Sequence, residues 1–262
     1  PDCGTELLRK EGDAKHYCPN EFGCPTQITG RIQHFISRKA MNIDGLGAES
    51  VELLFKNGLI HNFADLYELT KEQVMPLERM ADKSATNMII GIEASKITPF
   101  EKVLFALGIR FVGETVAKKL ARHYKNIDAL MDADYEELIA VDEIGERIAK
   151  SILLFFSDKG NCILIDRMKS YGLNLAIDES LLADQTEKLK GKVFVVSGVF
   201  HVLSRNELKK SIEDNGGKVT GSISKKTSFI IAGDSMGPSK KEKAESLGIP
   251  RISEQDYLSM VQ

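Results

Sequence analysis

Four copies of one short segment within the first 150 residues constrain the fold of this chain more than any other feature. The copies start at Asp44, Glu78, Arg110 and Asp142 and read DGLGAESVELL, ERMADKSATNM, RFVGETVAKKL and DEIGERIAKSI. In each copy an apolar residue is followed at once by a small one, and a polar stretch then opens an amphipathic pattern. These pairs are Leu46–Gly47, Met80–Ala81, Val112–Gly113 and Ile144–Gly145. A spacing of 34, 32 and 32 residues between the apolar centres indicates a structural repeat of paired helices.

The chemistry of such a turn is specific. A glycine-containing hairpin between two helices tolerates a positive φ and lets another chain approach the backbone closely. The next helix starts immediately, so its free N–H groups and the positive end of its dipole face outward. Together they form a small anion site that suits a nucleic-acid phosphate and ignores base sequence. This is the helix-hairpin-helix motif, and four in tandem predict a non-specific binder of duplex DNA.

A helical solenoid is the competing interpretation, because tetratricopeptide and ankyrin repeats have nearly the same period. The ankyrin signature TPLHxA is absent, and the tetratricopeptide pattern does not fit these segments. The second copy departs most from the others, because Arg79 and Ala81 stand where glycines are expected. Its backbone is therefore expected to be less open to a phosphate. Arg79 either touches phosphate through its side chain or is a solvated surface charge.

Composition fits a soluble globular protein of two or three domains, with 42% apolar and 28% charged residues in 262. No segment approaches the roughly 20 apolar residues of a membrane span. The net charge of −3 is unevenly distributed. Residues 96–125 hold seven basic and two acidic side chains, and residues 188–262 hold 13 basic and eight acidic ones. Between them, residues 126–148 hold one basic and eight acidic side chains. Basic regions are compatible with phosphate contacts, although charge runs are also typical of solvated helix faces.

The first 24 residues carry Cys3, Cys18 and Cys24 in a pattern typical of a zinc ribbon. Structural zinc takes four ligands, so one is missing. Either His16 supplies the fourth ligand, or a cysteine just before Pro1 does so, in a Cys-Pro-Asp-Cys segment that ends at Cys3. The usual Cys-x₂-Cys spacing of zinc ligands favours the second alternative. Because the chain starts without Met, we expect the natural protein to continue upstream. Three free buried thiols are the alternative to a metal site.

The pattern changes after an acidic linker expected over 176–187. Strands at KVFVVSG and TSFIIAG alternate with helices at SRNELKKSIEDNGG and SKKEKAESLG, which predicts a compact α/β unit with a small parallel sheet. These segments, the NGGKV turn and Tyr257 in the last expected helix resemble a BRCT domain. Some BRCT domains bind a phosphate, and the resemblance implies that Ser197, Gly198 and Lys243 would do so here, with Arg205 beside them. Alternatively, Ser197 only ends a strand and Lys243 is exposed.

The order of these modules resembles the C-terminal half of bacterial NAD-dependent DNA ligases. The stretch CGTELLRKEGDAKHYCPNEFGCPTQ carries the likeness most clearly, together with MNIDGLGAESVELL, FEKVLFALGIRFVGETVAKKLARHY and VDEIGERIAKSI. The expected fold is multidomain and mainly α. It comprises a zinc ribbon over 1–30, an all-α domain of four helix-hairpin-helix motifs over 31–175, the linker, and an α/β BRCT domain over 188–262. Departures are the absent first cysteine, Arg79, and Pro238 in the turn before the penultimate helix.

The resemblance implies a function for the parent enzyme, which would seal nicks in duplex DNA during replication and repair. Family members take adenylate from NAD onto a lysine, pass it to the 5′-phosphate, and use Mg²⁺ when the 3′-hydroxyl displaces AMP. The adenylation motif is absent here, so this chain is expected to grip DNA, to bind structural Zn²⁺ and to be inactive alone, with NAD and Mg²⁺ bound elsewhere. We expect a monomer in the bacterial cytoplasm, associated with the nucleoid and not with a membrane.

Candidate site residues follow from the four turns. We expect amides or charge to face phosphates near the nick at Gly45, Gly47, Gly108, Arg110, Gly113 and Gly145, and further electrostatic contacts from Arg79, Lys83, Lys118 and Arg147. Two other functions compete with this interpretation: another repair protein that combines hairpin motifs with a BRCT domain, and a non-catalytic protein-interaction scaffold. An autonomous enzyme has the least support, because no nucleophile–base group or phosphate-binding loop is visible.

Overall fold

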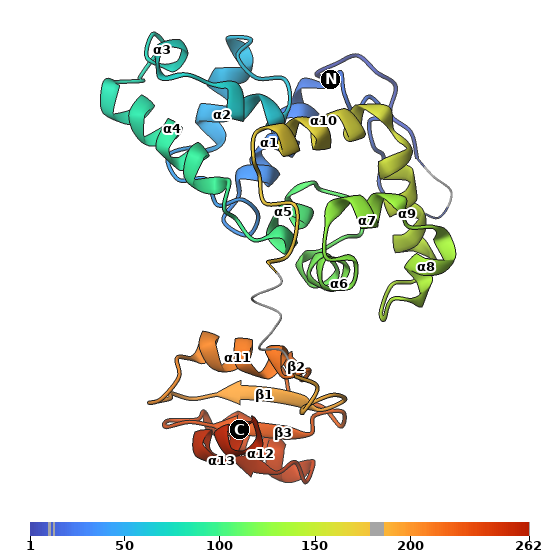
Figure 1. Cartoon of the computed structure of the whole chain (residues 1–262), viewed down its shortest axis with the longest axis vertical. Helices are drawn as coiled ribbons and strands as arrows, with labels where there is room; N and C mark the ends of the chain where they lie inside the picture. The colour runs from blue at the N-terminus through green and yellow to red at the C-terminus, as the bar shows by residue number, and fades with distance from the viewer. Residues whose placement is uncertain (10–11, 13, 179–185, 262) are drawn as a thin grey trace. The chain divides into compact units, whose positions relative to one another are not determined.

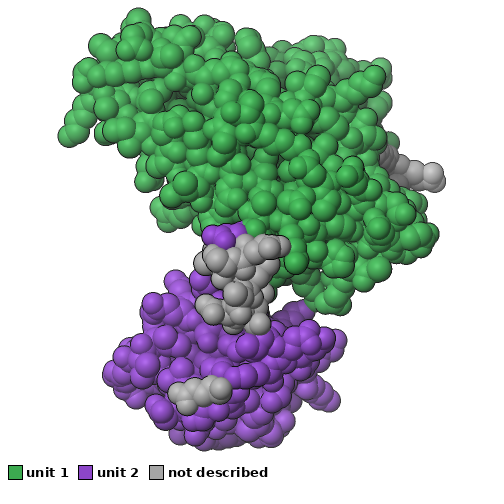
Figure 2. Space-filling model, in the orientation of Figure 1, with its two compact units in different colours: residues 1–177 green, residues 178–262 purple. Residues whose placement is uncertain are grey.

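The chain forms two compact units in the computed structural model, residues 1–177 and 178–262 (Figure 2). The structure describes residues 1–9, 12, 14–178 and 186–261. Most of the expected linker, 179–185, lies outside the described residues. Ala176 and Ile177, which the sequence assigns to that linker, belong to the first unit. Ala176 forms an antiparallel bridge with Asn126, and the Ile177 amide donates to the Lys125 carbonyl at 2.7 Å.

The first unit is almost entirely helical (Figure 1). Its elements are α1 (Pro25–Ile36), α2 (Ala48–Lys56), the 3₁₀-helix η1 (Phe63–Glu68), α3 (Lys71–Val74), α4 (Asp82–Ser95), α5 (Phe100–Ala106), α6 (Glu114–Tyr124), α7 (Ile127–Asp132), α8 (Tyr135–Ala140), α9 (Glu146–Ser157) and α10 (Lys159–Ser170). Helix α1 starts inside the range expected for the ribbon, directly after Cys24. None of the described helices is long and apolar enough to cross a membrane.

The repeat in the sequence is a repeat in the structure. Helices α2, α4, α6 and α9 each begin at the residue after the small one of a copy. The apolar centres anchor the turns in one hydrophobic core: Leu46, Val112 and Ile144 are buried, and Met80 packs against it half-buried. Fully buried side chains such as Ile32, Leu54 and Leu120 join the helices of successive copies in that core. The hairpins are therefore held at the surface by a shared interior.

The second unit is an α/β domain. Its elements are β1 (Val193–Ser197), α11 (Arg205–Asp214), β2 (Lys218–Thr220), β3 (Phe229–Ala232), α12 (Pro238–Ser246), β4 (Arg251–Ile252) and α13 (Glu254–Val261). All strand pairs are parallel, in the order β2-β1-β3-β4. The expected fold class is confirmed.

Alternation along β1 explains how both faces of this sheet are covered. Phe194 and Val196 pack with α11 and with the fully buried Tyr257 of α13, whereas Val195 faces Ala244 of α12. Successive strand residues point to opposite faces, so a strand buried on both sides is apolar throughout. Pro238 is the first residue of α12, a position that suits proline because its missing N–H has no helical partner there.

Candidate nucleic-acid interface

The four hairpins share one backbone geometry. The residue before each apolar centre is left-handed: Gly45 has φ +79°, Arg79 +63°, Phe111 +67° and Glu143 +65°. The small residue after the centre is extended, with φ between −76° and −117°, and is the N-cap of the following helix. Three non-glycine residues thus adopt the conformation that Gly45 adopts without penalty.

This geometry gives the glycines after the apolar centres a different role from the glycine before them. Gly47, Gly113 and Gly145 do not have a positive φ, so any residue could adopt their backbone conformation. A Cβ atom built on each of them would meet nothing within 4 Å among the described residues. A small residue at these positions therefore keeps the space in front of a helix N-terminus open. Arg79 and Ala81 give the second hairpin the same backbone conformation as the other three copies.

The four hairpin helices begin without a side-chain cap, as do α1 and α5, whereas other helices of the first unit are capped. Within the described residues, no side chain caps α2, α4, α6 or α9. In contrast, Thr70 caps α3, Asn126 caps α7, Asp134 caps α8 and Asp158 caps α10. Side-chain capping normally satisfies the first amides of a helix. The amides of the hairpin helices are thus left for water or for an anion.

Acidic side chains lie in the first turn of each hairpin helix, and most are ion-paired. Lys39 contacts Glu114 at 2.7 Å, Lys71 contacts Asp82 at 2.6 Å, and Lys150 contacts Glu146. The hydrogen bond from Lys150 lowers the pKa of Glu146. These acids complement the helix dipole, and their lysine partners offset the repulsion that they would exert on a phosphate.

We number the hairpins 1 to 4 in chain order, by the copies that start at Asp44, Glu78, Arg110 and Asp142. Hairpins 1 and 2 pack against each other. A Cβ atom on Gly45 would lie 3.2 Å from the Met88 amide nitrogen of α4, and one on Gly91 would lie 2.1 Å from the Asp44 carbonyl oxygen. Only glycines allow this approach. Gly45 and Arg79, both expected site residues, line one surface hollow between these hairpins, together with Glu49, Leu53, Met80 and Ser84.

Hairpins 3 and 4 form a second pair with reciprocal contacts. Ser151 of α9 donates to the Arg110 carbonyl of hairpin 3 at 2.7 Å. Lys119, at the corresponding place on α6, contacts Asp142 at 2.8 Å and Glu143 at 2.9 Å on hairpin 4. Burial lowers the pKa of Lys119, but its hydrogen bonds to these two carboxylates outweigh the burial and raise it. Lys119 therefore offsets part of the negative charge of hairpin 4.

In the second pair, the expected site residues Arg110 and Arg147 stack on Phe111, a residue that was not predicted from the sequence. The guanidinium carbons of Arg110 and Arg147 lie 4.9 Å and 4.0 Å from the centroid of the Phe111 ring. Phe111 is 39% exposed. One signal could have identified it: aligning the four copies places an aromatic residue in the turn position that Gly45 occupies.

The remaining hairpin residues are more dispersed. Gly108 (φ +71°) ends α5 and is exposed beside His34, so its left-handed conformation has a helix-ending role. Lys83 is exposed in the first turn of α4, and Lys118 is half-buried in α6. Both follow their turns, as expected.

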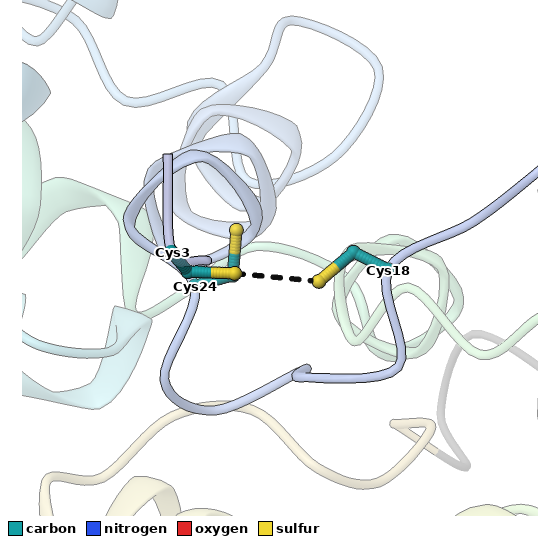
Figure 3. A group of neighbouring side chains, drawn as sticks. All are labelled: Cys3, Cys18 and Cys24. Carbon is teal, nitrogen blue, oxygen red and sulfur yellow. Dashed lines mark hydrogen bonds between the residues drawn. The ribbon is translucent and has the colours of Figure 1, made fainter. Parts of the chain in front are cut away.

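Cys3, Cys18 and Cys24 converge near the start of the first unit (Figure 3). Their sulfur atoms lie within 4.8 Å of one another, and those of Cys3 and Cys18 are 3.6 Å apart. A zinc–sulfur bond of about 2.3 Å implies about 3.8 Å between sulfurs at the corners of a tetrahedron. The cluster therefore fits one face of a zinc site. Among the described residues no histidine or carboxylate joins it, so the structure does not support His16 as the fourth ligand.

Backbone and side-chain hydrogen bonds hold this cluster in place. Leu8 and Tyr17 exchange two backbone hydrogen bonds of 2.8 Å in a small hairpin, and Gln27 donates to the Cys18 carbonyl at 2.9 Å. Hydrogen bonds from Thr5 lower the pKa of Cys3 to about 6, which favours the thiolate that binds metal. Cys24 is buried and is the N-cap of α1, so this ligand is built into the first helix of the hairpin region.

Three of the four expected phosphate residues of the second unit, Ser197, Gly198 and Arg205, make close contacts within that unit. Ser197 is buried at the end of β1, and its carbonyl accepts from the Gly233 amide at 2.9 Å. Gly198 has φ +111°, and a Cβ there would lie 2.6 Å from the Gly233 backbone. Arg205 donates to the Val196 carbonyl at 3.1 Å, and Lys243 is exposed on α12. Close packing thus explains Gly198 without a ligand.

Three family models match the chain. Residues 1–25 match the NAD-dependent DNA ligase C4 zinc finger domain, residues 102–165 the helix-hairpin-helix motif, and residues 184–256 the BRCA1 C Terminus (BRCT) domain. A DNA ligase of Flavobacterium johnsoniae is 63% identical over 259 residues, covering 99% of this chain and 39% of the relative. DNA ligases of Christiangramia forsetii and Bacteroides fragilis are 62% and 58% identical, over 40% and 39% of their lengths. The chain therefore spans about two fifths of these relatives.

Proposed function

Because this chain belongs to the NAD-dependent DNA ligases, whose zinc-finger, helix-hairpin-helix and BRCT modules it carries, we propose that it grips the DNA backbone beside a nick. Four uncapped helix N-termini at the tips of four hairpins support this proposal best. Backbone amides recognise phosphate and not base edges, so a grip of this kind suits an enzyme that must act at a nick in any sequence.

The catalytic step belongs to the parts of the ligase that this chain does not span. The relatives carry the name DNA ligase over lengths about two and a half times that of this chain. Nick sealing would use NAD and Mg²⁺ bound outside these residues, and the chain alone would be inactive. A DNA substrate in a bacterium would place the protein in the cytoplasm with the nucleoid. We propose that it acts as a monomer, because one chain carries all four hairpins.

Structural zinc is the cofactor that this chain itself would bind. Cys3, Cys18 and Cys24 supply three thiolates, and a C4 finger requires a fourth. We propose that the fourth is a cysteine just upstream of Pro1. Zinc would fix the ribbon to the start of α1 through Cys24 and so complete the fold of residues 1–24.

Phosphate binding by the second unit is a separate part of this proposal. Arg205 and Lys243 supply the cations, whereas Ser197 and Gly198 are explained by the sheet itself. Binding of a phosphorylated peptide or of DNA by isolated residues 186–262, lost on Arg205→Ala, would support a phosphate site there. Unchanged binding in that variant would exclude one centred on Arg205.

The test of the main proposal is binding of the 262-residue chain to nicked, intact and single-stranded DNA over a salt series, with zinc assayed on the same sample. One phosphate per hairpin predicts that log affinity falls with log salt at a slope of about −3.6, from about −0.9 for each contact. Tight, salt-dependent duplex binding is the expected result. A flat response by zinc-loaded protein would instead favour a protein-interaction scaffold.

A further inference from the structure

The last turn of α10 contacts both pairs of hairpins. Arg167 Nη2 lies 2.8 Å from Glu68 of η1, the short helix between hairpins 1 and 2. Two residues later, Lys169 Nζ lies 2.5 Å from Asp128 of α7, the short helix between hairpins 3 and 4. One helical turn therefore pairs with an acidic side chain on each of the two hairpin pairs.

The chain that follows α10 continues these contacts. The Asn174 amide donates to the Lys96 carbonyl, at the end of the helix of hairpin 2, at 3.0 Å. Residues 175–177 then run beside residues 125–127, through one bridge and backbone hydrogen bonds of 2.7 and 2.9 Å. We call residues 167–177 the strap. It is bonded to elements of both hairpin pairs.

The two short helices that the strap joins occupy equivalent places. An asparagine side chain caps each of them, Asn62 in η1 and Asn126 in α7. Each carries a buried leucine four residues after its cap, Leu66 and Leu130, and each leads to the second hairpin of its pair. Hairpins 1 and 2 with η1 therefore form one of two similar halves, and hairpins 3 and 4 with α7 form the other. A connection between η1 and α7 sets how these halves are oriented within the first unit.

The contacts of the strap on η1 are directional. Arg167 lies 2.8 Å from both Asp65 and Glu68. It also donates to the Asn62 side-chain oxygen at 3.4 Å, and the Tyr171 hydroxyl donates to Glu68. Hydrogen bonds from Tyr171 and Arg167 lower the pKa of Glu68, which keeps this carboxylate charged at neutral pH. Because guanidinium–carboxylate bonds have a defined geometry, the strap holds the η1 half at a particular angle.

Helix α1 connects the same halves mainly by burial. Phe35 of α1 is fully buried and stacks on Phe63 of η1, with 4.6 Å between the ring centroids. His34, one residue earlier, contacts the Phe105 carbonyl of α5 in hairpin 3 at 2.9 Å. Burial of apolar surface is non-directional. The core around α1 therefore keeps the two halves together, and the fold does not depend on the ion pairs of the strap.

We propose that the strap sets the spacing and angle of the two hairpin pairs so that both engage phosphates of one duplex at once, with Arg167 as the positioning residue. The inference rests on the proposed function, because it assigns to the strap the joint action of the hairpins on DNA. Two linked modules that engage one ligand together bind far more tightly than either does alone. Loosening the strap should therefore weaken only those complexes in which both pairs engage the same duplex.

Arg167→Met tests this role on duplexes of two lengths. Methionine keeps an apolar stem beside Tyr171 but removes the N–H donors, and Asp65 retains its bonds from the His61 and Asn62 amides. A duplex of about 20 base pairs spans about 68 Å, which suits both pairs, whereas a loop-closed stem of about 8 base pairs spans about 27 Å and suits one. We expect the variant to bind the long duplex about tenfold more weakly, and the short stem within about twofold of the wild type.

Arg31→Met is the matched control. Arg31 lies 2.8 Å from Glu21 and stacks on Phe22, and its side chain is 34% exposed against 26% for Arg167. Its contacts tie α1 to residues 1–24 and do not join the hairpin pairs, so this variant should keep the length dependence of the wild type. Arg167→Lys retains the charge but not the planar fork and should restore part of the affinity for the long duplex. Melting temperatures would show that each variant is folded in the assay.

A second substitution tests the joint action of the pairs directly. Gly47→Asn should occlude hairpin 1, because the Cβ position there is open and asparagine can cap α2. It should weaken binding to the long duplex by a larger factor in the wild-type chain than in the Arg167→Met chain, where the two pairs no longer act together. Equal factors in both backgrounds would contradict the inference, because the pairs would then act independently of the strap.

The outcomes separate this inference from the proposed function. A loss confined to the long duplex, with Arg31→Met unaffected, is the expected result. A loss by the same factor on both duplex lengths, or no loss on either, would overturn the role of the strap while leaving the hairpin grip intact. Absence of salt-dependent duplex binding by the zinc-loaded wild-type chain would overturn both proposals.

Discussion

At the residue scale, each hairpin divides two tasks between neighbouring positions. Gly45, Arg79, Phe111 and Glu143 supply the left-handed bend, and in three of these four the side chain makes that conformation costly. The small N-cap residues two positions later supply open space in front of the helix. A substitution at the left-handed position should therefore change the stability of the chain. A substitution at the N-cap position should change the access of a phosphate to the backbone amides.

Gly113→Asn and Gly113→Asp test access at the N-cap. Gly113 is extended and a Cβ there meets no described atom, so neither change should unfold the chain. Both side chains can cap α6, which should raise the free energy of unfolding by a few tenths of a kcal/mol. DNA affinity should nevertheless fall for Asn and fall further for Asp, because a carboxylate repels phosphate. Calorimetry and DNA titration on the same samples should show that stability rises while DNA affinity falls. Affinity that stayed at the wild-type value in both variants would contradict the assignment.

Arg79→Gly tests the cost of the left-handed bend. Arg79 has φ +63°, and its exposed side chain lies 3.7 Å from Glu78. Glycine should raise the free energy of unfolding by about 1 kcal/mol, because it adopts this conformation without steric penalty. Chemical denaturation would measure the gain. Gly45→Ala is the mirror control and should destabilise the chain, since it combines a positive φ with a Cβ 3.2 Å from the Met88 nitrogen. Equal stability of Arg79→Gly and wild type would mean that the bend is not strained.

The location of the four turns could be predicted from the sequence, whereas the role of each residue within a turn was less predictable. The repeat located Leu46, Val112 and Ile144 as buried anchors, because an apolar residue in an otherwise polar turn is stabilised mainly by burial. It did not assign the positive φ to a particular position, since composition alone does not reveal which of two nearby positions bends. It missed Phe111 because the stacking partner Arg147 lies 36 residues further along the chain. Contacts between copies are not visible within one copy.

At the element scale, the crossing of α4 over hairpin 1 depends most strongly on Gly91. A Cβ on Gly91 would lie 2.1 Å from the Asp44 carbonyl oxygen, and neither atom can rotate away, because the oxygen is backbone and the Cβ position is fixed by the backbone. Gly91→Ala should therefore cost about 3 kcal/mol or more, at the upper end of overpacking in a core. Denaturant unfolding would measure it. Gly30→Ala, on an open face of α1, is the control and should be neutral or slightly stabilising. A small effect at Gly91 would mean that the two hairpins are not packed so closely.

The second unit offers a pH-dependent contact between its loops. His201 Nε2 lies 2.6 Å from Asp234 Oδ2, and this hydrogen bond raises the pKa of His201 above its usual 6.5. Glu254, which accepts from the amides of His201, Val202 and Leu203, adds a smaller attraction in the same direction. Because the folded pKa is the higher one, the contact stabilises the unit fully below pH 6.5 and is lost as the pH rises through the folded value.

NMR titration of the His201 ring in isolated residues 186–262 would check this contact. We expect a midpoint above 6.5 in the wild type and a lower midpoint in Asp234→Asn, where the smaller attraction of Glu254 remains, with melting temperatures that differ below the wild-type midpoint and converge above it. A midpoint at or below 6.5 in the wild type would show that His201 and Asp234 do not interact in solution.

At the scale of the whole molecule, the order of modules was accessible from sequence because each module has its own chemistry. Cysteine spacing marks the ribbon, a period of 32 to 34 residues marks the hairpins, and apolar runs between amphipathic helices mark the parallel sheet. The end of the first unit was less accessible. Ala176 and Ile177 look like linker, yet they pair with Asn126 and Lys125. A bridge between positions about 50 residues apart leaves no local signature.

Removal of zinc tests how far the cysteine-containing ribbon stabilises the helices of the first unit. Cys24 is both a candidate ligand and the N-cap of α1, whereas the buried Ile32 and Phe35 tie α1 to the hairpin core independently of metal. Chelation, or Cys18→Ser, should therefore abolish zinc binding and expose the amides of residues 1–24 to hydrogen exchange while protection in α2 to α10 persists. Cys162→Ser is the control, since Cys162 lies outside the cluster and donates to the Phe156 carbonyl. Global loss of protection on chelation would instead make zinc a condition for folding of the whole unit, as it is for small zinc domains that lack a core.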